Sequence, residues 1–169
     1  MQEYREKREE IEQRVAEISR VARVTAGGRR FGFRILVIAG NRKGKVGMGI
    51  GKANDISDAI AKAGRQAVKH MTELPLRNGT IPFEIQAKFK MAKIILKPIS
   101  KGRGIIAGGV IRGICELAGV ENINAKVLSA SKSKINNARA IFLAFEKIKE
   151  LLNVKTRPSY AASSDKATS

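Results

Sequence analysis

Glycines at alternate positions and a terminal lysine give residues 47–52 the composition of a phosphate-binding loop. A nucleotide-binding loop of that class has four residues between its glycines and then Gly-Lys followed by Ser or Thr, whereas Ala53 follows Lys52 here. The dinucleotide-binding fingerprint fails as well, because these glycines alternate strictly. The segment therefore predicts no nucleotide site.

Side chains that could catalyse a reaction or bind a metal are few and isolated. His70 is the only histidine and has no plausible second ligand, so we predict a surface or boundary histidine rather than a metal ligand or general base. Asp55 and Asp58 suit the first turn of a helix, where carboxylates interact favourably with the helix dipole. No nucleophile has an obvious base. The sequence therefore predicts neither an enzyme nor a cofactor or metal site.

The single cysteine and the absence of long apolar runs indicate the compartment. Cys115 lies among Ile111, Ile114 and Leu117, which favours a buried thiol over a reactive one. One cysteine cannot form an internal disulfide, as is typical of a reducing compartment. No apolar run approaches the roughly 20 residues of a membrane span, and the charged N-terminal segment does not resemble a signal peptide. We therefore expect a cytosolic protein.

The charge of the chain points to a polyanionic partner. Its 33 Lys and Arg residues against 15 Asp and Glu residues give a net charge of +18, and 43% apolar residues are enough to build folded cores. Residues 20–52 carry nine cationic side chains and no acidic one. Such a density of like charge is unfavourable in a compact fold unless an anion neutralises it, and nucleic acid carries enough charge to do so.

A second acid-free stretch, residues 85–114, adds seven cationic side chains, so the sequence predicts two contact surfaces. We predict that phosphate contacts dominate the affinity for RNA. The predicted RNA-binding residues come from both stretches and are Arg20, Arg23, Gly27, Gly28, Arg29, Arg30, Arg42, Lys43, Lys45, Gly49, Gly51, Lys52, Lys101, Arg103 and Arg112.

Two glycine-rich segments each allow two interpretations. The alternating glycines of residues 47–51 leave one face of a predicted strand bare, either for packing against a helix or for close approach of a nucleic-acid backbone. Residues 102–109 contain four glycines before an apolar helical pattern. Their amides could bind an anion beside Lys101 and Arg103, while Gly108 and Gly109 could pack closely on a sheet.

The first half of the chain has the order of elements of a double-stranded-RNA-binding domain. Residues 3–17 predict a helical or frayed lead-in. Period-two patterns predict strands at residues 20–25, 31–38 and 46–51, with turns at Gly27-Gly28 and residues 40–44. An amphipathic helix with a basic outer side follows from Asn54-Asp55 to about Met71.

The second half predicts a two-layer α/β domain with its own core. Strands are expected at residues 81–89, 93–99 and 122–129, and helices at 106–118 and 134–152. The fold class is therefore α+β. We divide the chain into a lead-in (1–10), a double-stranded-RNA-binding-like domain with a three-stranded antiparallel sheet and a helix (11–74), a C-terminal α/β domain (75–152) and a mobile tail (153–169).

In order and spacing, the chain from about Glu10 to Leu152 resembles the bacterial small-subunit ribosomal protein S-five family. The matching stretches are residues 20–25, 27–29, 44–53, 78–80, 104–112, 117–120 and 125–126. The resemblance implies an N-terminal double-stranded-RNA-binding-like domain and a C-terminal domain of the type named after this family. The chain departs from the family pattern at Ala26, at Lys90-Met91, at Lys101 and Arg103, and at residues 131–134.

The resemblance also implies a function and partners. The expected function is that of a structural constituent of the small ribosomal subunit, which binds small-subunit rRNA and contributes to decoding accuracy. The expected neighbours are ribosomal proteins S-four and S-eight, and messenger RNA along the path by which it enters the subunit. Lys126 and Arg139 are the expected protein-facing residues, because their surroundings carry sparser outward charge than residues 20–52. The alternatives are a free-standing double-stranded-RNA-binding regulator and, more weakly, a nucleic-acid-modifying enzyme.

Overall fold

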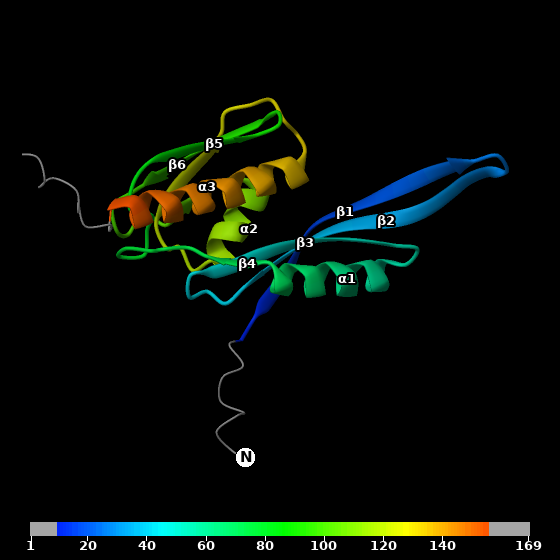
Figure 1. Cartoon of the computed structure of the whole chain (residues 1–169), viewed down its shortest axis with the longest axis horizontal. Coiled ribbons are helices and arrows are strands. Elements are labelled where there is room, and N and C mark those ends of the chain that lie inside the picture. The colour runs from blue at the N-terminus through cyan, green and yellow to red at the C-terminus, as the bar shows by residue number, and fades with distance from the viewer. Residues whose placement is uncertain (1–9, 156–169) are drawn as a thin grey trace, which may run out of the picture.

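The computed structural model describes residues 10–155 and shows an α+β protein with two four-stranded sheets and three helices (Figure 1). The first sheet is antiparallel, in the order β1-β2-β3-β4, and α1 covers one of its faces. Its strands are β1 (Glu12–Thr25), β2 (Gly28–Gly40), β3 (Lys45–Ala53) and β4 (Met71–Glu73), and α1 spans Ile56–Lys69. The predicted α+β class is confirmed.

Both faces of the inner part of β2 are buried. Ile35 and Val37 pack with Ala59 and Ala63 of α1. Leu36 and Ile38 point to the opposite face and belong to the main core. Since successive side chains of a strand point to opposite faces, the unbroken apolar run of residues 35–39 reflects this double burial.

The glycines of β3 lie directly under α1. A Cβ atom built on Gly47, Gly49 or Gly51 would overlap the carbonyl oxygen of Ala67, Ala63 or Ala59 respectively. The helix therefore approaches the strand at backbone distance, which only glycine permits. Of the two interpretations of the bare face, packing is correct. Gly49 and Gly51 are buried, and we remove them from the candidate RNA surface.

The predicted lead-in helix is wrong from Glu12 onward, because β1 begins there as an edge strand and pairs with β2 up to the tip of the hairpin. The acid-base spacing that favoured a helix instead places charges for contacts across the fold. Arg14 pairs with Glu116 at 2.6 Å, and Glu12 pairs with Arg42 at 2.7 Å. The part of the lead-in before Glu10 lies outside the described residues.

The second sheet has the order β5-β6-β8-β7, and only the β7–β8 pair is parallel. Helices α2 and α3 lie against one face of it (Figure 1). The strands are β5 (Ile85–Phe89), β6 (Ala92–Pro98), β7 (Ile105–Ile106) and β8 (Ile123–Val127), and the helices are α2 (Gly109–Leu117) and α3 (Lys134–Lys155).

Two predicted helix boundaries in this half are wrong. Residues 105–106 form a short strand instead of the start of a helix, because they pair with β8, and α2 begins only at Gly109. The predicted tail begins too early, since α3 continues to Lys155. The rest of that tail lies outside the described residues. The predicted stripe of α3 is confirmed, with Ala138, Ile141 and Phe145 all buried.

One hydrophobic cluster joins the two sheets. It contains Leu36, Ile38 and Val46 from the first sheet together with residues of α2, α3 and the second sheet. The β2–β3 turn also completes the end of α2, because the backbone N–H groups of Arg42 and Gly44 donate to the carbonyl oxygens at the helix terminus, both at 2.9 Å. The two halves of the chain are thus packed as a single body.

Candidate nucleic-acid interface

The outer part of the β1–β2 hairpin projects from the body as a two-stranded arm, which we define as residues 20–34 (Figure 1). The last pair of β2 with β3 joins Phe33 to Ala53, and five further pairs of β1 with β2 continue to Thr25 and Gly28 at the tip. The hydroxyl of Thr25 donates to the carbonyl oxygen of Gly28 at 3.0 Å and closes the turn. Gly28 has φ +122°, so this turn requires a glycine.

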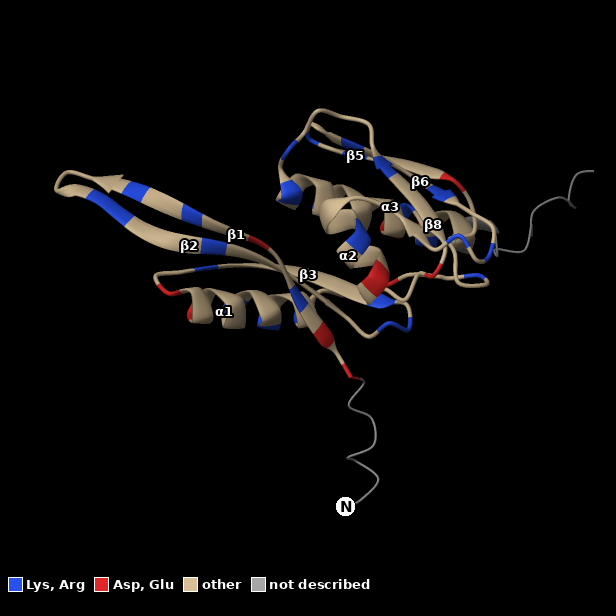
Figure 2. Cartoon of the chain, turned by 180° about the vertical axis from the view of Figure 1, so that it is seen from behind, with Lys and Arg blue, Asp and Glu red and all other residues tan. Residues whose placement is uncertain are grey.

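One face of the arm presents cations in directly opposed pairs. Figure 2 shows the Lys and Arg positions of the hairpin as blue bands along β1 and β2. Arg23 lies opposite Arg30, and Arg34 lies opposite Lys52 of β3. Like charges in this arrangement destabilise a sheet. No ion pair within residues 10–155 neutralises these four, and the buried Nε of Arg34 has no hydrogen-bond partner there. The arm therefore presents a binding surface for an anion.

The other face of the arm combines an arginine with apolar side chains. The guanidinium of Arg20 lies 4.0 Å above the ring of Phe31, a cation–π contact, and Arg29 lies nearer the tip. Phe31 is 51% exposed and Val24 is 75% exposed. A two-stranded ribbon with exposed side chains on both faces is marginally stable by itself, so a partner that surrounds the arm would stabilise it.

The turn between β2 and β3 carries three predicted RNA-binding residues with different surroundings. The guanidinium of Arg42 donates to Glu12, so its charge is already partly neutralised. Lys43 is exposed at the turn, and Lys45 lies half-buried opposite Glu73. The side-chain oxygen of Asn41, 7% exposed, accepts from both lysine backbone N–H groups and shapes the turn. Lys43 is therefore exposed and makes no ion pair with the described residues, whereas Arg42 is ion-paired and Lys45 is half-buried.

Arg112 is part of a three-residue ion cluster between the halves of the chain. Glu116 of α2 accepts from Arg112 at 3.0 Å, one helical turn away, and from Arg14 of β1 at 2.6 Å. The hydrogen bond from Arg14 is the largest cause that holds the pKa of Glu116 below its ordinary value of 4.5. Burial opposes this lowering, and the hydrogen bond from Arg112 and the charges of both arginines add to it. Arg112 thus has a structural contact as well as exposure to solvent.

Replacing Glu116 by Gln should reduce the dependence of stability on pH. Because the folded pKa of Glu116 is lowered, its ionised form stabilises the protein above pH 4.5, and this contribution disappears as the pH falls through the lowered pKa. In urea denaturation the variant should be less stable than the wild type at neutral pH and approach it in acid. Arg14→Gln should reduce the same dependence. If the difference in unfolding free energy between wild type and Glu116→Gln stayed constant from neutral pH to about pH 3, a lowered pKa of Glu116 would be contradicted.

The loop that contains Lys101 and Arg103 uses its amides internally. The backbone N–H groups of Gly102 and Gly104 donate to the side-chain oxygen of Asn122 at 2.9 and 3.1 Å, so they do not face an anion. The predicted close packing through Gly108 and Gly109 is wrong, since a Cβ atom at either glycine would meet nothing within 4 Å. The segment serves as a structural loop with two exposed cations.

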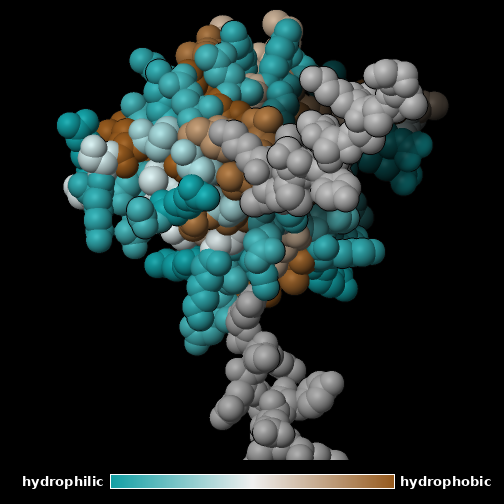
Figure 3. All heavy atoms as spheres, turned by 60° about the vertical axis from the view of Figure 1, so that its left-hand side comes forward, coloured by the Kyte–Doolittle hydropathy of each residue, from teal (hydrophilic) through white to brown (hydrophobic). Residues whose placement is uncertain are grey.

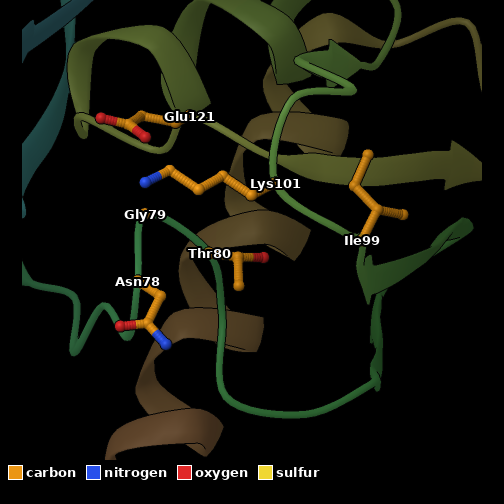
Figure 4. A pocket seen from close by; sticks show the side chains of 6 residues that line it. All are labelled: Asn78, Gly79, Thr80, Ile99, Lys101 and Glu121. Carbon is orange, nitrogen blue, oxygen red and sulfur yellow. The ribbon is translucent and has the colours of Figure 1, made fainter.

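Lys101 borders a polar hollow of about 700 Å³ (Figure 4). The loop of Asn78, Gly79 and Thr80 forms one side of it, and the amine end of Lys101 points toward Gly79 and the carboxylate of Glu121. The carbonyl oxygen of Gly79 accepts from the backbone N–H of Glu121 at 2.8 Å, which ties this loop to the start of β8. An acidic side chain at the rim makes this hollow less suited to phosphate than the arm.

Lys126 and Arg139, the two predicted protein-facing residues, lie on opposite sides of the second sheet. Lys126 is exposed on the face of β8 that points away from the helices, because its neighbours Ala125 and Val127 face inward. Arg139 belongs to α3 on the inner side, with its guanidinium 5.4 Å above the ring of Phe89. One flat partner surface cannot contact both residues.

The sequence interpretation counted Arg34 and the lysines of β5 and β6 in its two basic stretches but did not include them among the predicted RNA-binding residues. The available signal was the strand periodicity, because buried apolar residues alternate with less buried ones within 85–89 and again within 92–97, and Lys88, Lys93 and Lys97 occupy exposed positions. Arg34 lies at the same strand phase as Arg30, so it shares a face with that residue. Pairing between strands was needed to bring Arg34 beside Lys52.

The sequence predicts a buried Cys115 and a His70 at the surface, and the structure places both side chains in this way. Cys115 is fully buried, and burial raises the pKa of its thiol to about 12, so the thiol is protonated at neutral pH. His70 is exposed at the end of α1, where its Nδ1 lies 3.0 Å from the carbonyl oxygen of Gln66. No three metal-ligating side chains gather anywhere in residues 10–155.

Hydrophilic side chains prevail among the described residues on the side that faces away from the arm (Figure 3). In Figure 3, which turns this side forward, hydrophilic side chains dominate and apolar ones form small, interrupted patches. Within the described part of the chain, no helix has the length and apolarity to cross a membrane. Exposed cationic side chains on both sheets are typical of a protein that binds nucleic acid.

Comparison with known proteins identifies the family within this class. The family described as "Ribosomal protein S5, N-terminal domain" matches residues 11–75, and "Ribosomal protein S5, C-terminal domain" matches residues 87–157. The protein "Small ribosomal subunit protein uS5" of Thermosipho africanus is 43% identical over 159 residues, covering 90% of each chain. Its namesake from Thermus thermophilus is 47% identical over 146 residues, covering 86% of this chain and 90% of that protein.

The chain belongs to the ribosomal protein S5 family. The resemblance inferred from the sequence is therefore confirmed. This is a structural family without enzymatic activity, in agreement with the isolated positions of Cys115 and His70.

Proposed function

We infer that this protein is a structural constituent of the small ribosomal subunit and binds small-subunit rRNA by charge and shape complementarity. The observation that carries this function is the arm together with the adjoining Lys52 of β3. The opposed pairs Arg23–Arg30 and Arg34–Lys52 lack anionic partners within the described chain. Phosphate groups on RNA supply the missing charge without requiring a particular base sequence.

We propose that the RNA-facing residues of the first half are the arm cations, the tip glycines Gly27 and Gly28, and Lys43 at the exposed turn. A two-stranded ribbon is narrow enough to enter a groove or a junction between RNA helices, where phosphates surround it on both sides. The cation–π pair of Arg20 and Phe31 adds a rigid apolar contact to the charges. Arg42 and Arg112 contribute more to the fold, because each is already ion-paired.

The proposed partners beyond rRNA follow from family membership. We propose that the neighbours of the protein in the subunit are ribosomal proteins S-four and S-eight, and that it lies beside the path along which messenger RNA enters. A site there would let it influence decoding accuracy. The proposed location is the ribosome of the cytoplasm. The division into modules of residues 11–74 and 75–152 stays a prediction, although the matched family domains support it.

Sedimentation and salt titration together test this function. The protein should co-sediment with small subunits in one-to-one proportion at moderate salt, whereas a free-standing double-stranded-RNA-binding regulator would not. Its affinity for transcribed small-subunit rRNA should fall by about a thousand-fold or more between low and moderately raised salt, if six to ten phosphates are neutralised. Sub-stoichiometric sedimentation, or an affinity nearly independent of salt, would overturn the proposal.

A further inference from the structure

The segment that joins the two sheets contains the only Asn-Gly pair of the sequence, Asn78-Gly79. Arg77 and Thr80 exchange two backbone hydrogen bonds around this pair, of 2.9 and 3.0 Å. Asn78 has φ +52° and Gly79 has φ +73°. Positive φ at both central residues defines a type I′ turn, the turn in which Asn-Gly is strongly preferred. Asn78 is exposed at the tip of the turn.

No hydrogen bond holds the central peptide group of this turn in place. Within the described residues, the carbonyl oxygen of Asn78, the N–H of Gly79 and the Asn78 side chain all lack a partner. A flip of this peptide group converts a type I′ turn into a type II′ turn and leaves the Arg77–Thr80 pair intact. Glycine accepts either sign of φ, so Gly79 adapts to the flip without strain.

The flipped turn has the geometry in which an asparagine side chain reaches the next backbone nitrogen. In a type II′ turn, ψ of the first central residue is about −120°, so the nitrogen of Gly79 becomes eclipsed with Cβ of Asn78. A five-membered ring that joins this nitrogen to Cγ of Asn78 requires that arrangement. Gly79 has no side chain to obstruct the closure. The exposed Asn54 differs, because the side chain and charge of Asp55 oppose a reaction at the following nitrogen.

We propose that Asn78 is a site of spontaneous deamidation. The nitrogen of Gly79 gives its proton to solvent and forms a bond to Cγ of Asn78. The bond from Cγ to Nδ2 breaks, and Nδ2 takes up a proton and leaves as ammonia. Water then opens the resulting succinimide at one of its two carbonyl carbons. Residue 78 becomes aspartate by one opening and isoaspartate by the other, in which the backbone runs through Cγ and is longer by a methylene group.

The turn anchors the start of β8, so a longer backbone at residue 78 has effects beyond the turn. The carbonyl oxygen of Gly79 accepts from the backbone N–H of Glu121 at 2.8 Å and from that of Asn122 at 3.1 Å. Asn122 also holds the loop that follows Lys101, through its side-chain oxygen. Isoaspartate at residue 78 displaces the flanking pair of the turn and therefore weakens these contacts.

Deamidation also adds a carboxylate to the polar hollow of Figure 4. Asn78, Lys101 and Glu121 line that hollow together. The carboxylate of Glu121 already lies against the turn, since a Cβ atom built on Gly79 would be 2.6 Å from its Oε2. A second carboxylate there is repelled by the first. The aspartate product carries only this change of charge, whereas isoaspartate carries the longer backbone as well and should destabilise the protein more.

The test follows the free full-length protein during incubation at neutral pH in water labelled with heavy oxygen. Digestion in ordinary water and peptide mass spectrometry locate the incorporated label, and an isoaspartate-specific methyltransferase measures isoaspartate. Asn78→Gly is the matched control, because glycine keeps the positive φ of the turn and has no side-chain amide. Asn78→Asp represents the aspartate product. Thermal melts before and after incubation record the stability of each protein.

We expect label and isoaspartate at residue 78 of the wild type, with more label there than at Asn54. The melting temperature of the wild type should fall as the modified fraction grows, below that of Asn78→Asp, while that of Asn78→Gly stays constant. Equal labelling of Asn78 and Asn54, or label at residue 78 only after unfolding in urea, would overturn the inference. An unchanged melting temperature of fully modified protein would overturn the anchoring role of the turn. The test needs no RNA, so its result is independent of the proposed function.

Discussion

Replacing Gly49 by Val is expected to prevent stable folding of the protein. Even a single Cβ atom at this position would overlap the carbonyl oxygen of Ala63, and the added methyl groups would force α1 away from β3. The atoms involved are backbone atoms inside a helix, so they cannot move without breaking the contact between strand and helix. The free energy of unfolding should fall by at least about 3 kcal/mol, measured by urea denaturation.

Gly108→Ala is the matched control for this prediction. Gly108 has φ −101° and nothing within 4 Å of the position of its Cβ, so a methyl group there fits without strain. Its unfolding free energy should stay within about 0.5 kcal/mol of the wild type. If Gly49 instead contacted RNA, Gly49→Val would keep the wild-type melting temperature and lose RNA binding. That result would contradict the packing role.

Replacing both Arg23 and Arg30 by Gln should weaken binding to small-subunit rRNA by roughly 100-fold at moderate salt, taking about 1.4 kcal/mol for each charge-assisted contact with phosphate. The two side chains lie opposite each other on the arm and have no anionic partner within the described chain. Their removal relieves like-charge repulsion, so the stability of the free protein should stay the same or rise slightly. Filter binding and thermal melts measure the two quantities.

Two further variants separate charge from geometry in the arm. Arg23→Lys with Arg30→Lys keeps both charges but removes the planar fork of guanidinium, so an affinity between those of the wild type and the Gln variant indicates forked contacts with phosphate. Arg42→Gln is the structural comparison, because its side chain already pairs with Glu12. It should reduce rRNA affinity less than the Arg23 and Arg30 change. A Gln variant of the arm that binds as tightly as the wild type would exclude the arm as the main contact.

Sequence periodicity predicted the strands and helices that are regular and long. The alternation of residues 31–38 and 46–51 and the apolar stripe of residues 134–152 correspond to β2, β3 and α3. Periodicity failed where pairing between strands overrides the local preference of a segment for helix. Residues 12–17 have helical charge spacing, yet they lie in β1, because the ladder with β2 and the ion pairs of Glu12 and Arg14 stabilise the extended form. Ile105 and Ile106 became a strand for the same reason, through pairing with β8.

The candidate site was predicted only in part, because a list of cations does not say which of them face outward together. Arg20, Arg23, Arg29 and Arg30 were recognised from their density in an acid-free stretch, and the structure places all of them on the exposed arm. Gly49 and Gly51 were predicted to face RNA because they leave one face of the strand bare, but α1 covers that face. Lys126 was assigned to a protein contact, whereas the strand register groups it with Lys93, far away in the sequence.

The sequence by itself determined the α+β class and the excess of positive charge, because local spacing and composition are properties of the chain in any conformation. Only the tertiary structure decided which partner each residue has. The glycines of β3 meet a helix, Arg42 and Arg112 meet carboxylates, and the lysines of three strands share one face. The physical reason is that burial and charge neutralisation depend on groups brought close by folding, which are distant along the chain.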